Sequence, residues 1–260
     1  MLSSHITVIT GSIFVGMLLF MEIGRRIGRY RLADERSESG ASFLALEGSV
    51  FGLMGLLIAF TFSSAASRFD TRRHLVVDEA NDIGTAWKRL DLLPVSNRNA
   101  LQEKFRQYTD SRLEIYRDVS DAGRVARAMA RSKALQDDIW AAAVAACREV
   151  PSPATTTLIL SSLNAMFDIT TTRTVAAQTH LPWVIVSLLA VLPLICALLA
   201  GLDAATNPQR SWLRIIGFAL MVSITVFVIL DLDYPRVGLI RIDTFDRVLI
   251  ELRNSMQAGI

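Results

Sequence analysis

The chain has 260 residues, of which 52% are hydrophobic and 20% are charged, and its mean hydropathy is +0.38. This composition is too apolar for an ordinary soluble domain, yet its charged fraction indicates that a substantial part meets water. The net charge of +2 gives no reason to expect a nucleic-acid partner. Cys147 and Cys196 lie far apart, which argues against a disulfide framework or a metal site, and we expect no cofactor.

The N-terminal segment, roughly residues 6–23, predicts a first transmembrane helix. No Lys or Arg precedes Arg25, and no small-residue cleavage site follows the apolar run. The segment is therefore not typical of a secretory signal, and we expect it to be retained as a membrane span.

The second span, roughly residues 43–66, begins one long predicted helix. The 20 residues from Gly48 to Ser67 carry no charge. At ~1.5 Å rise per residue they match the ~30 Å core of a bilayer. Apolar residues keep helical spacing beyond them, at Leu75, Ile83 and Trp87. We therefore expect the helix to leave the membrane and continue to about residue 92.

Two further apolar segments, residues 181–202 and 215–230, predict the third and fourth spans. The first of these opens with Pro182, and we expect a kink at Pro193. The region between the second and third spans has helical periodicity throughout. After Pro94 we expect one helix capped by Ser96, then a helix over residues 124–149 and another that follows Pro153 back to the membrane.

The sequence thus predicts an all-α integral membrane protein with four transmembrane helices and a helical extramembrane domain between the second and third spans. The expected divisions are residues 1–66 for the first two spans, 67–180 for the helical domain, 181–232 for the last two spans and 233–260 for a C-terminal extramembrane segment.

Small residues recur at spacings of three or four along the second span, at Gly48, Gly52, Gly55 and Ala59. Such a stripe lets helices approach closely in lipid, where apolar burial alone does not drive association. We interpret it as a helix-packing surface. The contact could lie within one subunit or between subunits, and the spacing does not decide between them.

An adjacent stripe carries larger apolar residues, Leu53, Leu56, Leu57 and Phe60, followed by the hydroxyls of Ser63, Ser64 and Ser67. Its apolar part could simply face lipid or the protein core, which is the more common role. It could also form a ring around an axis, a hydrophobic constriction of the kind that gates a channel.

Charged residues lie at the ends of the second and fourth spans, which leave the membrane on the same side. Asp231 and Asp233 end the fourth span, and Arg72 and Arg73, with Arg68 before them, follow the second. Charges at such depths usually pair with one another, so we expect structural ion pairs rather than an ion site. The sequence has no phosphate-binding glycine loop, no Cys or His pair at metal spacing and no nucleophile elbow, so we do not expect an enzyme.

The end of the second span resembles the corresponding helix of the bestrophins, where a Phe and small residues precede Arg and aromatic residues. The matching positions are Phe60, Ser64, Ala65, Arg68, Phe69, Arg73 and Leu75. The segment Leu232 to Gly238 is similar to the acidic, Pro- and Gly-containing stretch after the last bestrophin helix. Nearly the whole chain resembles the bacterial bestrophin-like membrane proteins, whose domain is of unknown function.

Bestrophins are homopentameric ion channels, mostly anion-selective, whose second helices line a neck with apolar residues at every fourth position. The resemblance matches Phe60 to the neck and makes Leu56 a conservative replacement, whereas Gly52 has no side chain to close a third layer. The acidic run that binds calcium in animal bestrophins is absent, so we expect no calcium gating.

The orientation in the membrane stays open. The bestrophin plan places the inter-span domain in the cytoplasm, whereas the distribution of arginines near the span ends slightly favours the opposite orientation.

The resulting hypothesis is a homo-oligomeric ion channel of a bacterial inner membrane, a pentamer by resemblance, that passes small inorganic ions, most of all anions, and contacts membrane lipid. Leu56, Phe60, Ser63 and Ser64 would line the pore and its neck, and Ser67 and Arg68 the ion exit. The alternative is a non-conducting membrane scaffold or sensor whose helical domain binds a partner.

Overall fold

The computed structural model describes residues 2–33, 40–117, 121–150, 152–205 and 212–257. Across these residues the chain is helical with short connections and contains no strand, which confirms the all-α prediction. The chain divides into two compact units. The first contains Met1–Phe69 and His180–Ile240, and the second contains Asp70–Thr179 and Arg241–Ile260.

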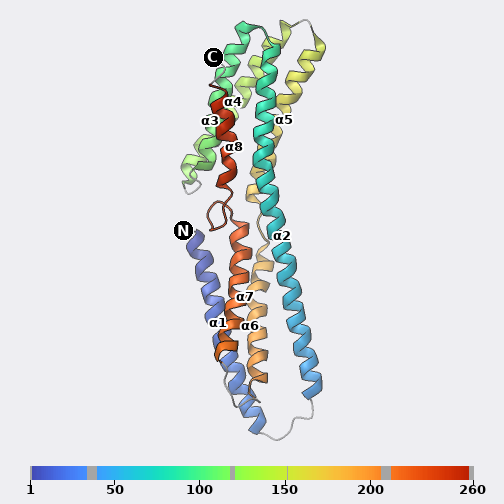
Figure 1. Ribbon diagram of the computed structural model, residues 1–260, viewed down its shortest axis with the longest axis vertical. Coiled ribbons are helices and arrows are strands. Elements are labelled where there is room, and N and C mark those ends of the chain that lie inside the picture. The colour runs from blue at the N-terminus through green and yellow to red at the C-terminus, as the bar shows by residue number, and fades with distance from the viewer. Residues whose placement is uncertain (1, 34–39, 118–120, 151, 206–211, 258–260) are drawn as a thin grey trace. The chain divides into compact units, whose positions relative to one another are not determined.

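The first unit holds α1 (Leu2–Ala33), the N-terminal part of α2 (Gly40–Arg89), α6 (Trp183–Asp203) and α7 (Trp212–Asp233). Each contains an apolar window long enough to cross a bilayer, and four such helices are found among the described residues. The four predicted spans are therefore confirmed. Figure 1 shows α1 beside α6 and α7 in this unit.

Glycines bring the backbones of α1 and α6 together. A Cβ atom placed on Gly24 would lie 2.1 Å from the carbonyl oxygen of Leu198, and one on Gly201 would lie 2.1 Å from that of Met21. No side chain fits at such distances, so only glycine permits this approach. Sequence analysis predicted packing glycines only on the second span, so Gly24 and Gly201 were not predicted as packing positions.

Helix α2 runs without a break from Gly40 to Arg89 and ends in a 3-10 turn, Leu90–Leu92 (Figure 1). This confirms the prediction of one long helix that continues beyond the span. Within the first unit α2 buries Met54 and Ala65 in apolar clusters that also contain side chains of α6 and α7, such as Leu189 and Ile229. One face of the span is therefore packed against its neighbours.

The second unit packs the C-terminal part of α2 with α3 (Val95–Arg117), α4 (Ala122–Arg148) and α5 (Pro153–Gln178). Asp121 caps α4 by accepting a hydrogen bond from the Arg124 amide, and Ser152 caps α5 by accepting one from the Thr155 amide. The fully buried core contains residues from all four helices, among them Ile83, Phe105, Tyr108, Ile139, Leu163 and Met166.

The structure corrects the predicted start of α3. The helix begins at Val95, and the carbonyl of Pro94 accepts hydrogen bonds from the amides of Asn97 and Arg98 at 3.1 and 3.0 Å. Ser96 therefore lies inside the first turn and is not the cap. The preceding proline supplies the first acceptor instead.

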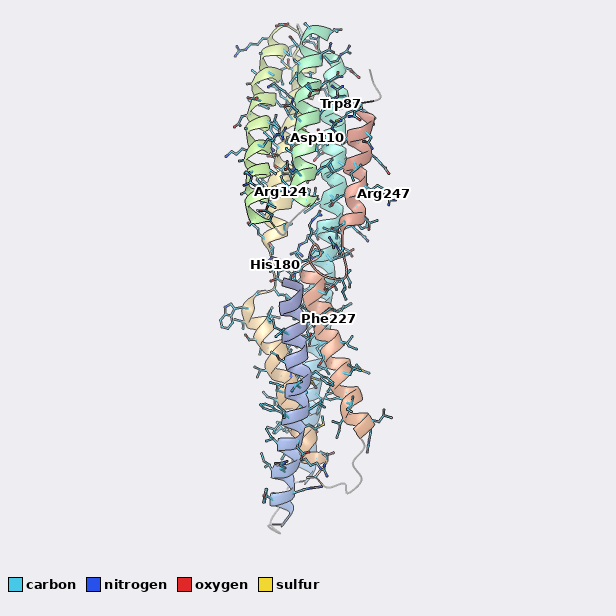
Figure 2. The ribbon with its side chains drawn as sticks, turned by 90° about the vertical axis from the view of Figure 1, so that its left-hand side faces the viewer. Trp87, Asp110, Arg124, His180, Phe227 and Arg247 are labelled. Carbon is cyan, nitrogen blue, oxygen red and sulfur yellow. The ribbon has the colours of Figure 1, made fainter. Side chains whose placement is uncertain are left out.

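The C-terminal residues fold into the second unit through a 3-10 turn, Asp243–Phe245, and α8 (Asp246–Ser255). Arg253 of α8 donates two hydrogen bonds, of 2.7 and 2.9 Å, to the carboxylate of Asp110 on α3, which is labelled in Figure 2. Arg106 of α3 donates to the carbonyl of Met256 at 3.0 Å. The sequence predicted an extramembrane segment here but not its packing on α3.

Candidate functional site

The face of α2 opposite its packed side is open within the chain. Leu53, Leu56 and Phe60 are 57%, 52% and 66% exposed, whereas Met54 and Thr61 on the packed side are buried. Thr61 satisfies its hydroxyl by donating to the Leu57 carbonyl at 2.6 Å. Of the predicted apolar stripe, Leu57 is partly buried against the cluster that contains Leu189 and Ile229, whereas the exposed surface of Leu53, Leu56 and Phe60 is available to lipid, to another copy or to a pore.

The small residues of the span lie in open space as well. A Cβ atom on Gly48, Gly52 or Gly55 would meet no atom within 4 Å, and Ala59 is exposed. Within the described chain these residues therefore bring no helix close, in contrast to Gly24 and Gly201. Their proposed packing role concerns contacts with other copies.

The exposed hydroxyls of Ser63, Ser64 and Ser67 follow the apolar stripe by one turn and more. Ser64 accepts a hydrogen bond of 2.7 Å from Nη1 of Arg68. The structure therefore brings Arg68 to one of the predicted hydroxyls, at the point where the apolar surface of the span ends.

Arg68 is also half of an ion pair. Its Nε lies 3.0 Å from Oδ1 of Asp233, whose side chain is 2% exposed at the end of α7. A buried carboxylate needs such a partner, because an unpaired charge in a low-dielectric site is costly. From the sequence we predicted an ion pair between the ends of the second and fourth spans, and in the structure Arg68 and Asp233 form this pair. The role of Arg68 at an ion exit stays a prediction.

Asp233 also fixes the start of α6. Its Oδ2 accepts a hydrogen bond of 2.9 Å from the Leu181 amide and lies 3.4 Å from Nδ1 of His180. The His180 ring, labelled in Figure 2, stacks on Tyr234 with ring centroids 4.4 Å apart. One carboxylate therefore connects α2, the turn before α6 and the end of α7.

Asp231 has a different role from the expected ion pair. Its two carboxylate oxygens accept hydrogen bonds from the backbone amides of Leu239 and Ile240, at 2.9 and 2.8 Å. A Cβ atom on Gly238 would lie 2.3 Å from Oδ1 of Asp231, so this turn requires glycine. Asp231 thus holds the connection that follows α7.

Arg72 and Arg73 contact groups of the second unit. Arg72 is buried and donates to the carbonyls of Ala176 and Thr179 at 2.9 and 2.6 Å, which satisfies the C-terminal end of α5. Arg73 pairs with Asp70 at 3.2 Å, and its guanidinium lies 5.3 Å from the centroid of the Phe245 ring.

The second unit contains a buried charge network that was not predicted from the sequence. Glu79 of α2 is fully buried and accepts hydrogen bonds from Nε of Arg112 on α3, at 2.5 Å, and from Nη1 of Arg173 on α5. Tyr116 accepts a hydrogen bond of 2.5 Å from Nη2 of Arg112, and its ring lies 3.6 Å below the Arg173 guanidinium. Burial would raise the pKa of the Glu79 carboxyl, but the two guanidiniums hold it below its usual value.

The described residues include no group of three or more His, Cys, Asp and Glu side chains that could hold a metal ion. The arrangement around α2 instead consists of an exposed apolar stripe, a set of hydroxyls and a neutralised Arg–Asp pair at the end of the spans.

Four apolar helices of spanning length define the class: this is a multi-span helical membrane protein. The family model of the Bestrophin-like domain matches residues 11–244, and the chain belongs to the bestrophin-like family. This membership confirms the resemblance found in the sequence and supports a channel-type function.

Solved structures show the same fold. One is a crystal structure of a bacterial bestrophin homologue from Klebsiella pneumoniae, with a TM-score of 0.66 and 14% identity over 93% of this chain and 97% of that chain. A form of that homologue with a single substitution gives a TM-score of 0.68 and 14% identity over 95% of this chain and all of the other. A search of the curated proteins finds no match.

Proposed function

We propose that the protein is a homo-oligomeric ion channel whose copies surround an axis lined by α2. The observation that carries the proposal is the open face of this helix. Leu53, Leu56 and Phe60 are each more than half exposed in a span whose other face is packed, and the chain belongs to a family with a channel-type function. By the resemblance of the sequence to the bestrophins, the proposed assembly is a pentamer.

Leu56 and Phe60 form the narrowest part of the proposed pore. They lie four residues apart, so their side chains project from one face of α2 on successive turns. Rings of such side chains from several copies make a constriction that excludes water unless an ion enters. Gly52, one turn earlier, widens the pore because it has no side chain.

Hydroxyls replace part of the hydration shell of an ion beyond the constriction. Ser63 and Ser64 line the pore there, and Ser67 with Arg68 lies at the exit. The Arg68 charge is compensated by Asp233 at 3.0 Å, so anions are favoured mainly by hydroxyl and guanidinium N–H donors and not by a net positive ring. The conducted ions are small inorganic anions, and no catalytic step is required.

The small residues Gly48, Gly55 and Ala59 allow the copies to approach closely beside the pore. Their open surroundings within one chain support this role. The remaining exposed apolar side chains of α1, α6 and α7 contact membrane lipid, and a bacterial inner membrane is the proposed location.

The test is ion flux from liposomes that contain the purified protein. Chloride and potassium gradients are imposed separately, and protein-free liposomes provide the background. The proposal predicts flux above background with a preference for chloride. A well-folded oligomer that passes neither ion would overturn the proposal and favour a non-conducting scaffold or sensor, with the second unit as the place where a partner binds.

A further inference from the structure

We propose that the second unit contains a binding site for a small hydroxylated anion, such as a hydroxycarboxylate or a phosphate ester. The site is a cavity of about 310 Å³ between α3, α4 and α5. It is lined mainly by polar side chains, among them Arg112, Ser132, Lys133, Gln136, Thr170 and Thr174. It lies wholly within the second unit, and the proposal does not depend on ion conduction.

The charges of the lining favour an anion. Arg112 and Lys133 both line the cavity, and no Asp or Glu residue is among its lining residues. Glu79 pairs with Arg112 on the side away from the cavity, and Arg173, which shares Glu79, also pairs with Asp246, so the charge of Arg112 is compensated. Lys133 makes no ion pair with the described residues, so its ammonium group is the uncompensated charge at the site.

Unused hydrogen-bond donors lie beside these charges. Ser132 is 3% exposed, and its hydroxyl makes no hydrogen bond with the described residues. The hydrogen bonds of Arg112 within the described chain use Nε and Nη2, which leaves Nη1. The Ser132 hydroxyl and Nη1 of Arg112 therefore remain free to donate hydrogen bonds to a ligand atom or to water in the cavity.

The α5 wall supplies acceptors instead of donors. Thr170 donates its hydroxyl hydrogen to the Phe167 carbonyl at 2.7 Å, and Thr174 donates to the Thr170 carbonyl at 2.7 Å. The Thr170 oxygen also accepts a hydrogen bond of 3.2 Å from Nε2 of Gln136, so the Thr174 oxygen is the acceptor left fully open to a ligand, and the hydrogens of both hydroxyls are used. A ligand that satisfies both walls carries an anionic group toward Arg112 and Lys133 and a hydroxyl toward α5.

The cavity is open to solvent on one side and has room for a small molecule. Its space of about 310 Å³ far exceeds the ~10–15 Å³ that one water molecule requires, so several water molecules or a small organic anion can occupy it. Malate fits this description and serves as the probe. Succinate differs from malate by one hydroxyl and tests the α5 wall separately.

The experiment is isothermal titration calorimetry of the purified full chain in detergent, with malate or succinate at constant ionic strength set by sodium chloride. Saturable binding of malate is expected, with succinate several-fold weaker. Lys133→Glu should raise the Kd for malate by about ten-fold or more, because it reverses the uncompensated charge. Lys88→Glu, an exposed lysine on α2 of the same unit, is the matched control and should leave the Kd unchanged.

A second variant separates the cavity from general surface charge. Met129→Trp places a larger side chain at the cavity wall without changing charge, and it should abolish malate binding while the thermal unfolding midpoint is retained. The site is refuted if wild type shows no saturable binding up to about 10 mM malate. It is also refuted if Lys133→Glu binds as wild type does, and equal Kd values for malate and succinate would overturn the hydroxylated ligand.

Discussion

At the scale of single residues, the second unit depends on one buried carboxylate that compensates two arginines. Glu79, Arg112 and Arg173 come from three different helices, so their charges hold α2, α3 and α5 in one arrangement. Removing one member of such a set leaves a buried charge without its partner. Stability should therefore be far more sensitive to Glu79 than to exposed acidic residues of the same unit.

Glu79→Gln tests this dependence. The variant keeps the shape of the side chain but removes the carboxylate that pairs with Arg112 and leaves Arg173 with Asp246 alone, at 3.5 Å, so we expect a loss of about 3–5 kcal/mol in the free energy of unfolding. The measurement is denaturant unfolding of the second unit's helices, followed by circular dichroism in detergent. Glu103→Gln on the exposed face of α3 is the control, and an equal effect of both variants would contradict the role of Glu79.

The same carboxylate predicts an acid dependence of stability. The folded state lowers the pKa of Glu79 from 4.5, so its contribution is present above this unfolded value and is lost as the pH falls through the lower folded value. Wild type should therefore lose stability on acidification below about pH 4, and Glu79→Gln should lose less over the same range. Parallel pH profiles of the two proteins would contradict the prediction.

Sequence reasoning could predict charges at the span ends but not this network. Asp233 and Arg68 lie at the ends of apolar spans. A charge at such a position needs an oppositely charged partner, and the ends of the other spans are the nearest candidates. Glu79 stands in a polar stretch, and its partners lie 33 and 94 residues away. Without the packing of three helices, no local pattern connects them.

At the scale of the helices, α1 and α6 meet through glycine, while Gly48, Gly52 and Gly55 of α2 have no neighbour among the described residues within 4 Å of a Cβ position. The sequence correctly predicted that small residues allow helices to pack closely, but it placed these residues in α2 and not in α1 and α6. The decisive property is the partner at each position, such as the Leu198 carbonyl at Gly24, and spacing along one helix does not reveal it. The long uncharged run and its continuing periodicity were sufficient to predict α2 itself.

Gly201→Ala and Gly55→Ala form a matched pair of variants. The added methyl of Gly201→Ala would lie 2.1 Å from the Met21 carbonyl, so the two helices must separate, at a cost of about 1–3 kcal/mol or more. Gly55→Ala adds its methyl in open space and should leave the stability of the chain unchanged or raise it by about 0.5–1 kcal/mol. Thermal unfolding in detergent compares them, and similar midpoints would contradict the packing described for α1 and α6.

At the scale of the whole molecule, the stripe of small residues in α2 is the proposed contact between copies. Gly55→Leu places a large side chain in that contact and should reduce the oligomer fraction by at least several-fold, as measured by size-exclusion chromatography with light scattering. Gly217→Leu on α7, which also lies in open space, is the control and should leave the assembly intact. If the Gly55→Leu oligomer stays intact, the stripe is not the contact between copies, and it faces lipid or the pore instead.

The central claim is that ions pass a neck formed by the open face of α2. The measurement that tests it most directly is chloride flux from liposomes with Phe60→Ala, compared with Phe62→Ala as the matched control on the same helix. Both phenylalanines are exposed, but they project in different directions around α2. We predict that Phe60→Ala raises flux by roughly ten-fold, equivalent to a barrier lowered by ~1.4 kcal/mol, or changes the ion preference, while Phe62→Ala behaves as wild type. Unchanged flux and ion preference in Phe60→Ala would contradict the neck.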